Sequence, residues 1–166
     1  MTQPAPLPDN EVQRLSRLRE LAILDSEPEP LFDTLTQLAS ATCGVPVALV
    51  SLIDTDRQWF KARVGLPDVT ETPRDISFCA HAILEDDVME VADATRDPRF
   101  ADNPLVTGEP GIRFYAGAPI RLPDGSRIGT LCVIDRQPRI LSSKQRLALQ
   151  HLAQIAADAL LMRERT

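Results

Sequence analysis

The sequence predicts an α+β domain built on one central antiparallel sheet of about five or six strands. Two helical segments precede the first strand, a clear hairpin occupies residues 111–135, and a long helix follows the last strand. Helices that gather before and after a run of hairpins are typical of this class, because antiparallel neighbours need no crossover helix between them. We therefore expect the terminal helices on one face of the sheet and a pocket, walled by a loop and a helix, on the other.

The hairpin at residues 111–135 is the most distinct element of the sequence. Apolar side chains alternate with other residues over 112–120, which is the period of a strand with two different faces. A Pro-Asp-Gly-Ser turn follows, and the return strand at 127–134 is apolar on both faces, as in the centre of a sheet. Gly117 and Gly129 weaken strands unless another group approaches closely, so we expect a helix or a ligand against them.

The N-terminal part of the chain predicts a tail and two helices. Residues 1–8 are proline-rich and expected to be flexible, and residues 9–166 form one folded domain. Helices are predicted over residues 9–24 and 31–43, the second ended by Gly44. The apolar positions expected to face inward are Val12, Leu15, Leu18, Leu21 and Ala22 in the first helix and Phe32, Leu35, Leu38 and Ala39 in the second.

Two strands follow these helices. Residues 45–53 are a nearly continuous apolar run rich in β-branched side chains, which predicts a central strand. Residues 57–65 alternate apolar and polar side chains and predict a partner strand with one half-exposed face, and a short strand is expected at 88–91. The alternating sets are Phe60, Ala62 and Val64 on one side and Trp59, Lys61 and Arg63 on the other.

The C-terminal helix, from Leu141 to the end, carries more apolar surface than one sheet face can cover. We expect a homodimer whose interface is made by the terminal helices at residues 9–24 and 143–163; an ordinary amphipathic helix is the alternative. The two stripes are Ala148, Leu152, Ile155, Ala159 and Met162, and Leu149, Ala153, Ala156 and Leu160.

Composition limits the class of partner. The chain has 166 residues, of which 43% are hydrophobic, enough for a core without disulfides or metals. Its 18 basic and 24 acidic residues give a net charge of −6, which disfavours nucleic acid and anionic membranes as partners. Without a membrane-length apolar run or a signal peptide, we expect a cytoplasmic protein. Cys43, Cys79 and Cys132 form no CxxC or CxxH pair and are interpreted as reduced, small apolar residues.

The helical segment at residues 77–85 and the loop after it hold the polar residues that suggest chemistry. Ser77, His81 and Glu85 lie four residues apart on one stripe, but no strained nucleophile turn accompanies them, so we expect no hydrolase. The loop carboxylates Asp93, Asp97 and Asp102 lack the alternate spacing of a calcium loop, so we expect no metal site.

We predict a pocket between the sheet and the segments 77–85 and 93–108, because long structured loops commonly form binding walls. Arg99 and Arg113 favour an anionic ligand; pairing of both with the loop carboxylates is the alternative. The candidate ligand-binding residues are Ser77, Phe78, Cys79, His81, Arg99, Phe100, Arg113, Phe114 and Tyr115.

Five segments, taken in this order, resemble the GAF domains of bacterial signalling proteins, which are often attached to histidine kinases or diguanylate cyclases. The resemblance covers roughly residues 23–161 and implies a non-catalytic sensory module that binds an unidentified small molecule or dimerises and signals to an output partner such as a kinase or cyclase. The segments are ALVSLIDTDRQWFKARVGL, SFCAHAI, DPRFADNPLV, IRFYAGAPI and GTLCVID.

The known ligands of such domains find little support in these residues, and the cofactor remains unassigned. The Asn-Lys-Phe-Asp-Glu signature of the cyclic-nucleotide-binding members is absent, and Cys79-Ala80-His81 departs from the Cys-His pair of the bilin-binding members. Haem binding would depend on His81 as the single axial ligand, a lone histidine without a supporting motif. Two alternatives stay open: a thiol-dependent enzyme similar to the free methionine sulfoxide reductases that share this fold, and a purely structural dimerisation domain.

Overall fold

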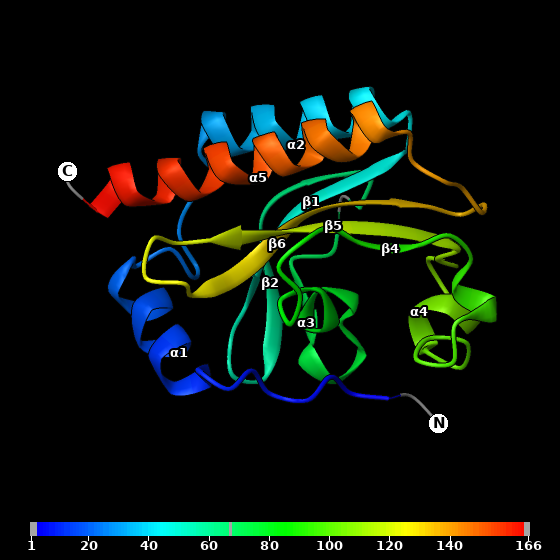
Figure 1. Cartoon of the computed structure of the whole chain (residues 1–166), viewed down its shortest axis with the longest axis horizontal. Helices are drawn as coiled ribbons and strands as arrows, with labels where there is room; N and C mark the ends of the chain where they lie inside the picture. Colours follow the sequence, from blue (N-terminus) through cyan, green and yellow to red (C-terminus); the bar gives the residue numbers. More distant parts are fainter. Residues whose placement is uncertain (1–2, 67, 165–166) are drawn as a thin grey trace.

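The computed structural model describes residues 3–66 and 68–164. Its centre is a six-stranded antiparallel sheet with the strand order β3-β2-β1-β6-β5-β4 (Figure 1). The central pair, β1 and β6, is buried along almost its whole length, as the apolar composition of both segments predicts. The strands are β1 (Val47–Ile53), β2 (Arg57–Val64), β3 (Glu71–Pro73), β4 (Met89–Val91), β5 (Phe114–Arg121) and β6 (Arg127–Asp135).

Helices α2 and α5 lie side by side over one face of the sheet, whereas α3 lies on the opposite face (Figure 1). Gly44 ends α2, as predicted, and adopts the left-handed conformation, whereas Pro30, one residue before the predicted start, occupies the first turn. The helices are α1 (Glu11–Glu20), α2 (Pro30–Cys43), α3 (Phe78–Ala82), α4 (Pro104–Thr107) and α5 (Ser143–Glu164), with 3₁₀ turns η1 (Arg74–Ile76) and η2 (Ala94–Arg96).

Helix α1 does not share a sheet face with α5, so the expectation that both terminal helices cover one face is wrong. It lies by the start of β6, away from α5 (Figure 1), where Arg14 Nη1 donates to the Ile53 carbonyl across 2.7 Å. The inward side of α1 carries Arg14 and Leu18, while Val12, expected inside, is 84% exposed. Burying an arginine satisfies the carbonyl at the end of β1, and an aliphatic side chain could not do this.

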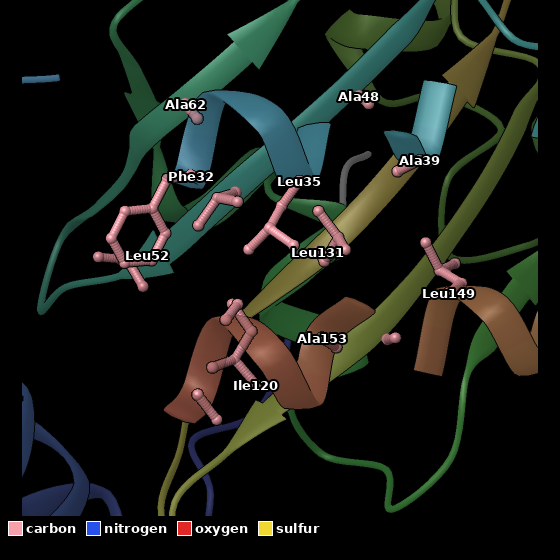
Figure 2. Packing of buried hydrophobic residues seen from close by; sticks show 14 of the residues in the cluster. Phe32, Leu35, Ala39, Ala48, Leu52, Ala62, Ile120, Leu131, Leu149 and Ala153 are labelled. Carbon is pink, nitrogen blue, oxygen red and sulfur yellow. The ribbon is translucent and has the colours of Figure 1, made fainter. Parts of the chain in front are cut away.

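The core between the sheet and the α2–α5 layer is made mainly of aliphatic side chains, with the rings of Phe32, Trp59 and Phe114 among them. Figure 2 shows Phe32, Leu35 and Ala39 from α2 and Leu149 and Ala153 from α5 against side chains of the sheet. On α5 the stripe through Leu149 and Ala153 faces this core. The other predicted stripe is turned partly outward, since Ile155 is 45% and Met162 65% exposed; on α2, Leu38 is 48% exposed instead of buried.

A β-bulge in β2 breaks the predicted alternation. Val50 pairs with Ala62 and Ser51 with Phe60, so Lys61 is the extra residue. Phe60 and Ala62, on either side of Lys61, consequently point to opposite faces of the sheet instead of the same face. Trp59 packs under α2 instead of on a half-exposed face. Lys61 is buried as well, because its ammonium group pairs with Glu29 across 2.6 Å.

The two strand glycines make room for neighbours other than the expected helix or ligand. A Cβ atom on Gly129 would meet the Ser51 carbonyl oxygen of β1 at 1.9 Å, and one on Gly117 would meet the Tyr115 hydroxyl at 2.2 Å. Both glycines therefore serve close approach within the sheet itself. No helix of the described chain is long and apolar enough to cross a membrane.

Candidate functional site

A cavity of about 360 Å³ lies between the sheet, helix α3 and two loops. Its floor comes from the strands β1, β2, β5 and β6, and its walls from α3, the segment after β2 and the loop around α4. The lining residues are Leu49, Gln58, Phe60, Gly65, Leu66, Asp68, Val69, Thr72, Phe78, Cys79, Leu105, Glu109, Pro110, Ile112, Tyr115, Ile134 and Arg136. The lining is mainly apolar, with polar groups at a few points, as is usual for small-molecule pockets.

Gln58 anchors the polar part of the floor through three hydrogen bonds. Its Oε1 atom accepts from Ser51 Oγ at 2.9 Å and from Ser77 Oγ at 2.8 Å, and its Nε2 atom donates to Thr72 Oγ1 at 2.8 Å. Ser77 also caps α3 by accepting from the backbone N–H of Ala80. The Ser77 hydroxyl is thus fully engaged in positioning α3 against β2.

Cys79 and Tyr115 meet at the base of the cavity. The Tyr115 hydroxyl donates to Cys79 Sγ at 3.1 Å, Thr130 Oγ1 donates to the same sulfur at 3.0 Å, and Cys132 Sγ lies 3.8 Å away. Burial raises the pKa of the Cys79 thiol, but the hydrogen bonds from Cys132, Thr130 and Tyr115 favour the thiolate more strongly, so the pKa falls to about 7. Burial and the nearby sulfurs raise the pKa of Tyr115, which keeps its hydroxyl a donor.

Phe78, Cys79 and Tyr115 are the three predicted site residues that line the cavity. Phe100 lies behind Phe78 and stacks on it, with ring centroids 4.0 Å apart. His81 is buried, and its Nε2 atom lies 3.0 Å from the Gln3 carbonyl of the N-terminal segment. Burial lowers the pKa of His81, so the neutral ring donates this hydrogen bond. With that nitrogen occupied, the geometry does not favour His81 as a haem ligand.

The predicted arginines and Phe114 are directed elsewhere. Arg99 forms a bidentate pair with Asp97, with Nη2 to Oδ2 at 2.8 Å and Nε to Oδ1 at 3.1 Å, which is the alternative foreseen for this residue. Arg113 donates to the carbonyls of Val106 and Ile112 and holds the loop around α4 to the start of β5. Phe114 is buried in the core under α2 and α5, on the opposite sheet face from Tyr115.

Several lining residues were not foreseen from the sequence. Gln58 and Phe60 belong to β2, whose phase depends on the bulge at Lys61, and Thr72 lies in β3, a strand of only three residues. Asn103 caps α4 by accepting from the Leu105 N–H, which sets Leu105 beside the cavity. Within residues 3–66 and 68–164, no three His, Cys, Asp or Glu side chains gather to hold a metal ion.

Comparison with known proteins decides the family. A model of the GAF domain family matches residues 27–160. The chain belongs to the GAF domain family. Its six-stranded sheet with flanking helices is the architecture shared with the GAF domain of an Acinetobacter phosphoenolpyruvate-protein phosphotransferase (TM-score 0.68, 19% identity), where the match covers 96% of this chain and 98% of that one.

Two further proteins are similar to this chain, one in sequence and one in fold. It is 47% identical over 151 residues to a cyclic di-GMP phosphodiesterase of Pseudomonas aeruginosa, covering 90% of this chain but only 26% of that protein. The chain therefore spans about a quarter of the length of this curated relative. It also shares the fold of a type II free methionine-R-sulfoxide reductase from Thermoplasma acidophilum (TM-score 0.58, 17% identity), with 80% of this chain and 96% of that chain covered.

Proposed function

We propose that this GAF domain is a non-catalytic sensory module that binds a small, largely apolar molecule in the cavity between the sheet and α3. The observation that carries the proposal is the cavity itself: about 360 Å³ of space with apolar walls is within the usual range of ligand pockets. Well-packed cores leave few voids larger than a water molecule, so a space of this size is a feature that packing alone does not require.

The charged residues of the lining are of both signs, with Asp68 and Glu109 against Arg136, so the cavity does not favour the anionic ligand predicted from the sequence. Arg99 and Arg113 are committed to the loop and do not line the cavity. The Gln58 amide is held by Ser51, Ser77 and Thr72, so it presents a fixed dipole and needs no ligand to satisfy it. A small aromatic or aliphatic molecule with one or two hydrogen-bonding groups fits this surface best.

The test combines native mass spectrometry with a variant that fills the cavity. We expect the purified protein to retain a small molecule, or to gain thermal stability with members of a library of small aromatic and aliphatic compounds. Leu105→Trp places an indole in the cavity and should abolish the retained mass or the stabilisation. Val12→Trp, an 84% exposed position on α1, is the matched control and should retain both. Identical behaviour of the two variants would contradict the proposal.

The partner that this module controls is proposed from the activity of its P. aeruginosa relative. Because the P. aeruginosa relative is a cyclic di-GMP phosphodiesterase and this chain spans a quarter of its length, we propose that the domain controls a partner of cyclic di-GMP metabolism, or a kinase, without catalysing the reaction itself. Incubation of the purified chain with cyclic di-GMP should give no hydrolysis. Hydrolysis that co-purifies with the chain and is lost on unfolding it would contradict the non-catalytic assignment.

We further propose that the module forms a homodimer through the outer face of the α2–α5 layer. Leu31 and Leu38 on α2 are both 48% exposed and lie seven residues apart, as do Ile155 and Met162 on α5. Residues at this spacing lie on one side of a helix, so each helix presents an apolar stripe to solvent. Pairing with a second copy removes both stripes from water, whereas the cavity on the other sheet face stays free.

One observation favours a second function, that of a thiol-dependent reductase. Cys79 faces the cavity and has Cys132 within 3.8 Å, although the sequence places no base or second cysteine near either. Reduction of free methionine sulfoxide needs two thiols and yields methionine, a disulfide and water. Consumption of a dithiol reductant with free methionine sulfoxide, lost in Cys79→Ser and retained in Cys43→Ser, would establish the reductase; unchanged reductant supports the sensory module.

A further inference from the structure

A dithiol lies at the base of the cavity and has no part in the sensory function proposed above. Cys79 is the second residue of α3, and Cys132 lies in the middle of the central strand β6. Their Sγ atoms are 3.8 Å apart, and both residues are almost completely buried. Only Cys79 lines the cavity, so the pair has a front sulfur, reached through the cavity, and a rear sulfur enclosed in the core.

Hydrogen-bond donors converge on the front sulfur. Tyr115 Oη and Thr130 Oγ1 lie 3.1 and 3.0 Å from Cys79 Sγ, from two adjacent strands. Donors that point at a sulfur stabilise its anion, and the thiolate is the nucleophilic form of cysteine. The pKa of Cys79 falls to about 7, whereas burial and the adjacent Cys79 raise the pKa of Cys132. The pair is thus divided into a nucleophile and a protonated neighbour.

The third cysteine lacks these features and serves as an internal reference. Cys43 ends α2 and belongs to the core on the opposite sheet face. Burial raises the pKa of its thiol. The chain therefore carries two chemically distinct classes of buried cysteine, and only one of them is open to a cavity.

We propose that Cys79 and Cys132 are a redox-active pair that a hydroperoxide entering the cavity converts into an intramolecular disulfide. The Cys79 thiolate attacks the outer oxygen of the hydroperoxide, the O–O bond breaks, and the leaving alkoxide or hydroxide takes a proton from water. The resulting sulfenic acid then condenses with the Cys132 thiol, which forms the S–S bond and releases water. The hydroperoxide gains the two electrons that the two sulfurs lose.

The geometry allows closure with a small shift of one element. A disulfide has an S–S distance of about 2.05 Å, so the sulfurs must approach by roughly 1.8 Å. β6 is fixed between β1 and β5, whereas α3 is a helix of five residues, so we expect α3 to move. Cys79 would leave the Tyr115 and Thr130 hydroxyls, and the cavity wall would change. This last effect rests on the proposed ligand function; oxidation of the pair does not.

The experiment follows the three thiols of the reduced full chain during exposure to hydrogen peroxide. We expect two of the three thiols to disappear, a loss of about 2 Da in the intact mass, and a cross-link between the tryptic peptides 75–96 and 128–136. Cys79 should react at least about tenfold faster than Cys43, which lies in a third peptide, 20–57. Cys43→Ser should form the same cross-link at the same rate.

Two variants separate the steps of the reaction. Cys132→Ser should stop at the sulfenic acid, which dimedone traps on Cys79, and Cys79→Ser should leave Cys132 reduced; melting curves confirm that each variant folds. Three intact thiols under peroxide, or a cross-link that includes Cys43, would overturn the proposal. It would also fail if free methionine sulfoxide, but not peroxide, closed the disulfide, since the pair would then belong to a reductase. Loss of ligand binding alone would count only against the proposed sensory function.

Discussion

The Tyr115 hydroxyl donates a hydrogen bond to Cys79 Sγ across 3.1 Å, and this contact joins strand β5 to helix α3 at the base of the cavity. It couples the ionisation of a thiol to the position of the only tyrosine of the chain. Two further groups at this sulfur, Cys132 and Thr130, come from β6.

Removing the Tyr115 hydroxyl should raise the pKa of Cys79. In the wild-type protein, the rate of modification of Cys79 by methyl methanethiosulfonate should increase with pH around a midpoint of about 7. Tyr115→Phe and Thr130→Val each delete one donor, so the midpoint should move to higher pH and the rate at pH 7 should fall several-fold. Thr130→Ser keeps the hydroxyl and should keep the midpoint; an equal shift in this variant would argue against the donor mechanism.

A methyl group at Gly129 should strongly destabilise the fold. A Cβ atom there would lie 1.9 Å from the Ser51 carbonyl oxygen, and this is backbone of the central strand, which cannot move aside. Gly129→Ala should cost about 3 kcal/mol or more of unfolding free energy, measured by denaturant titration. Gly125→Ala is the control, because a Cβ atom added there would meet no atom within 4 Å. Only the φ of +91° opposes this substitution, which should cost about 1–2 kcal/mol of unfolding free energy. The reverse order of costs would contradict the close approach of β1 and β6.

The carboxylate of Glu11 should govern part of the acid stability. It pairs with Arg14 at 2.8 Å and with Arg74 at 2.6 Å; burial raises the pKa of Glu11, but these two guanidinium groups lower it further, below 4.5. This stabilisation is fully present above pH 4.5 and is lost as the pH falls through the lower pKa of the folded state. Glu11→Gln should lower the unfolding free energy at pH 7 by about 1–3 kcal/mol. The unfolding free energy of this variant should also depend less on pH below pH 4.5. Glu20→Gln should leave both unchanged, because its ion pair with Arg17 is exposed.

Ile155 should carry the proposed dimer interface. Light scattering at tens of micromolar should give a dimer for the wild-type chain. Ile155→Glu introduces a charge into the apolar stripe and should raise the dissociation constant at least about a hundredfold, because an unpaired charge is costly to bury. Val12→Glu on α1, an 84% exposed position away from α5, should remain dimeric. A monomeric wild type, or a dimer lost equally in both variants, would rule out the α2–α5 interface.

The sheet could be predicted from the sequence where the local pattern decides the structure. The hairpin of β5 and β6 and the strand β1 depend on neighbours within a few residues, and both are confirmed. The three-residue strand β3 was missed, since its Glu-Thr-Pro sequence has no strand pattern and is held by pairing with β2. The burial of Arg14 depends on a carbonyl 39 residues away, which no local pattern reveals.

The site was harder to predict, although one error was avoidable. The alternation along 112–120 puts Phe114 and Tyr115 on opposite faces, so only one of the two could line a cavity on one side of the sheet. The cysteine pair could not be foreseen, because 53 residues separate Cys79 from Cys132 and only the packing of α3 on β6 brings them together.

The bulge at Lys61 has a consequence for how β2 tolerates a change in length. Before the bulge, Gln58 and Phe60 lie on the cavity side; after it, Ala62 lies on the side of α2. Deleting Lys61 would leave Ser51–Phe60 and Val50–Ala62 as neighbouring pairs in a regular ladder, so Phe60 would stay on the cavity side and Trp59 under α2. A change in length by one residue at this position can therefore alter the packing beside α2 and leave the floor of the pocket intact.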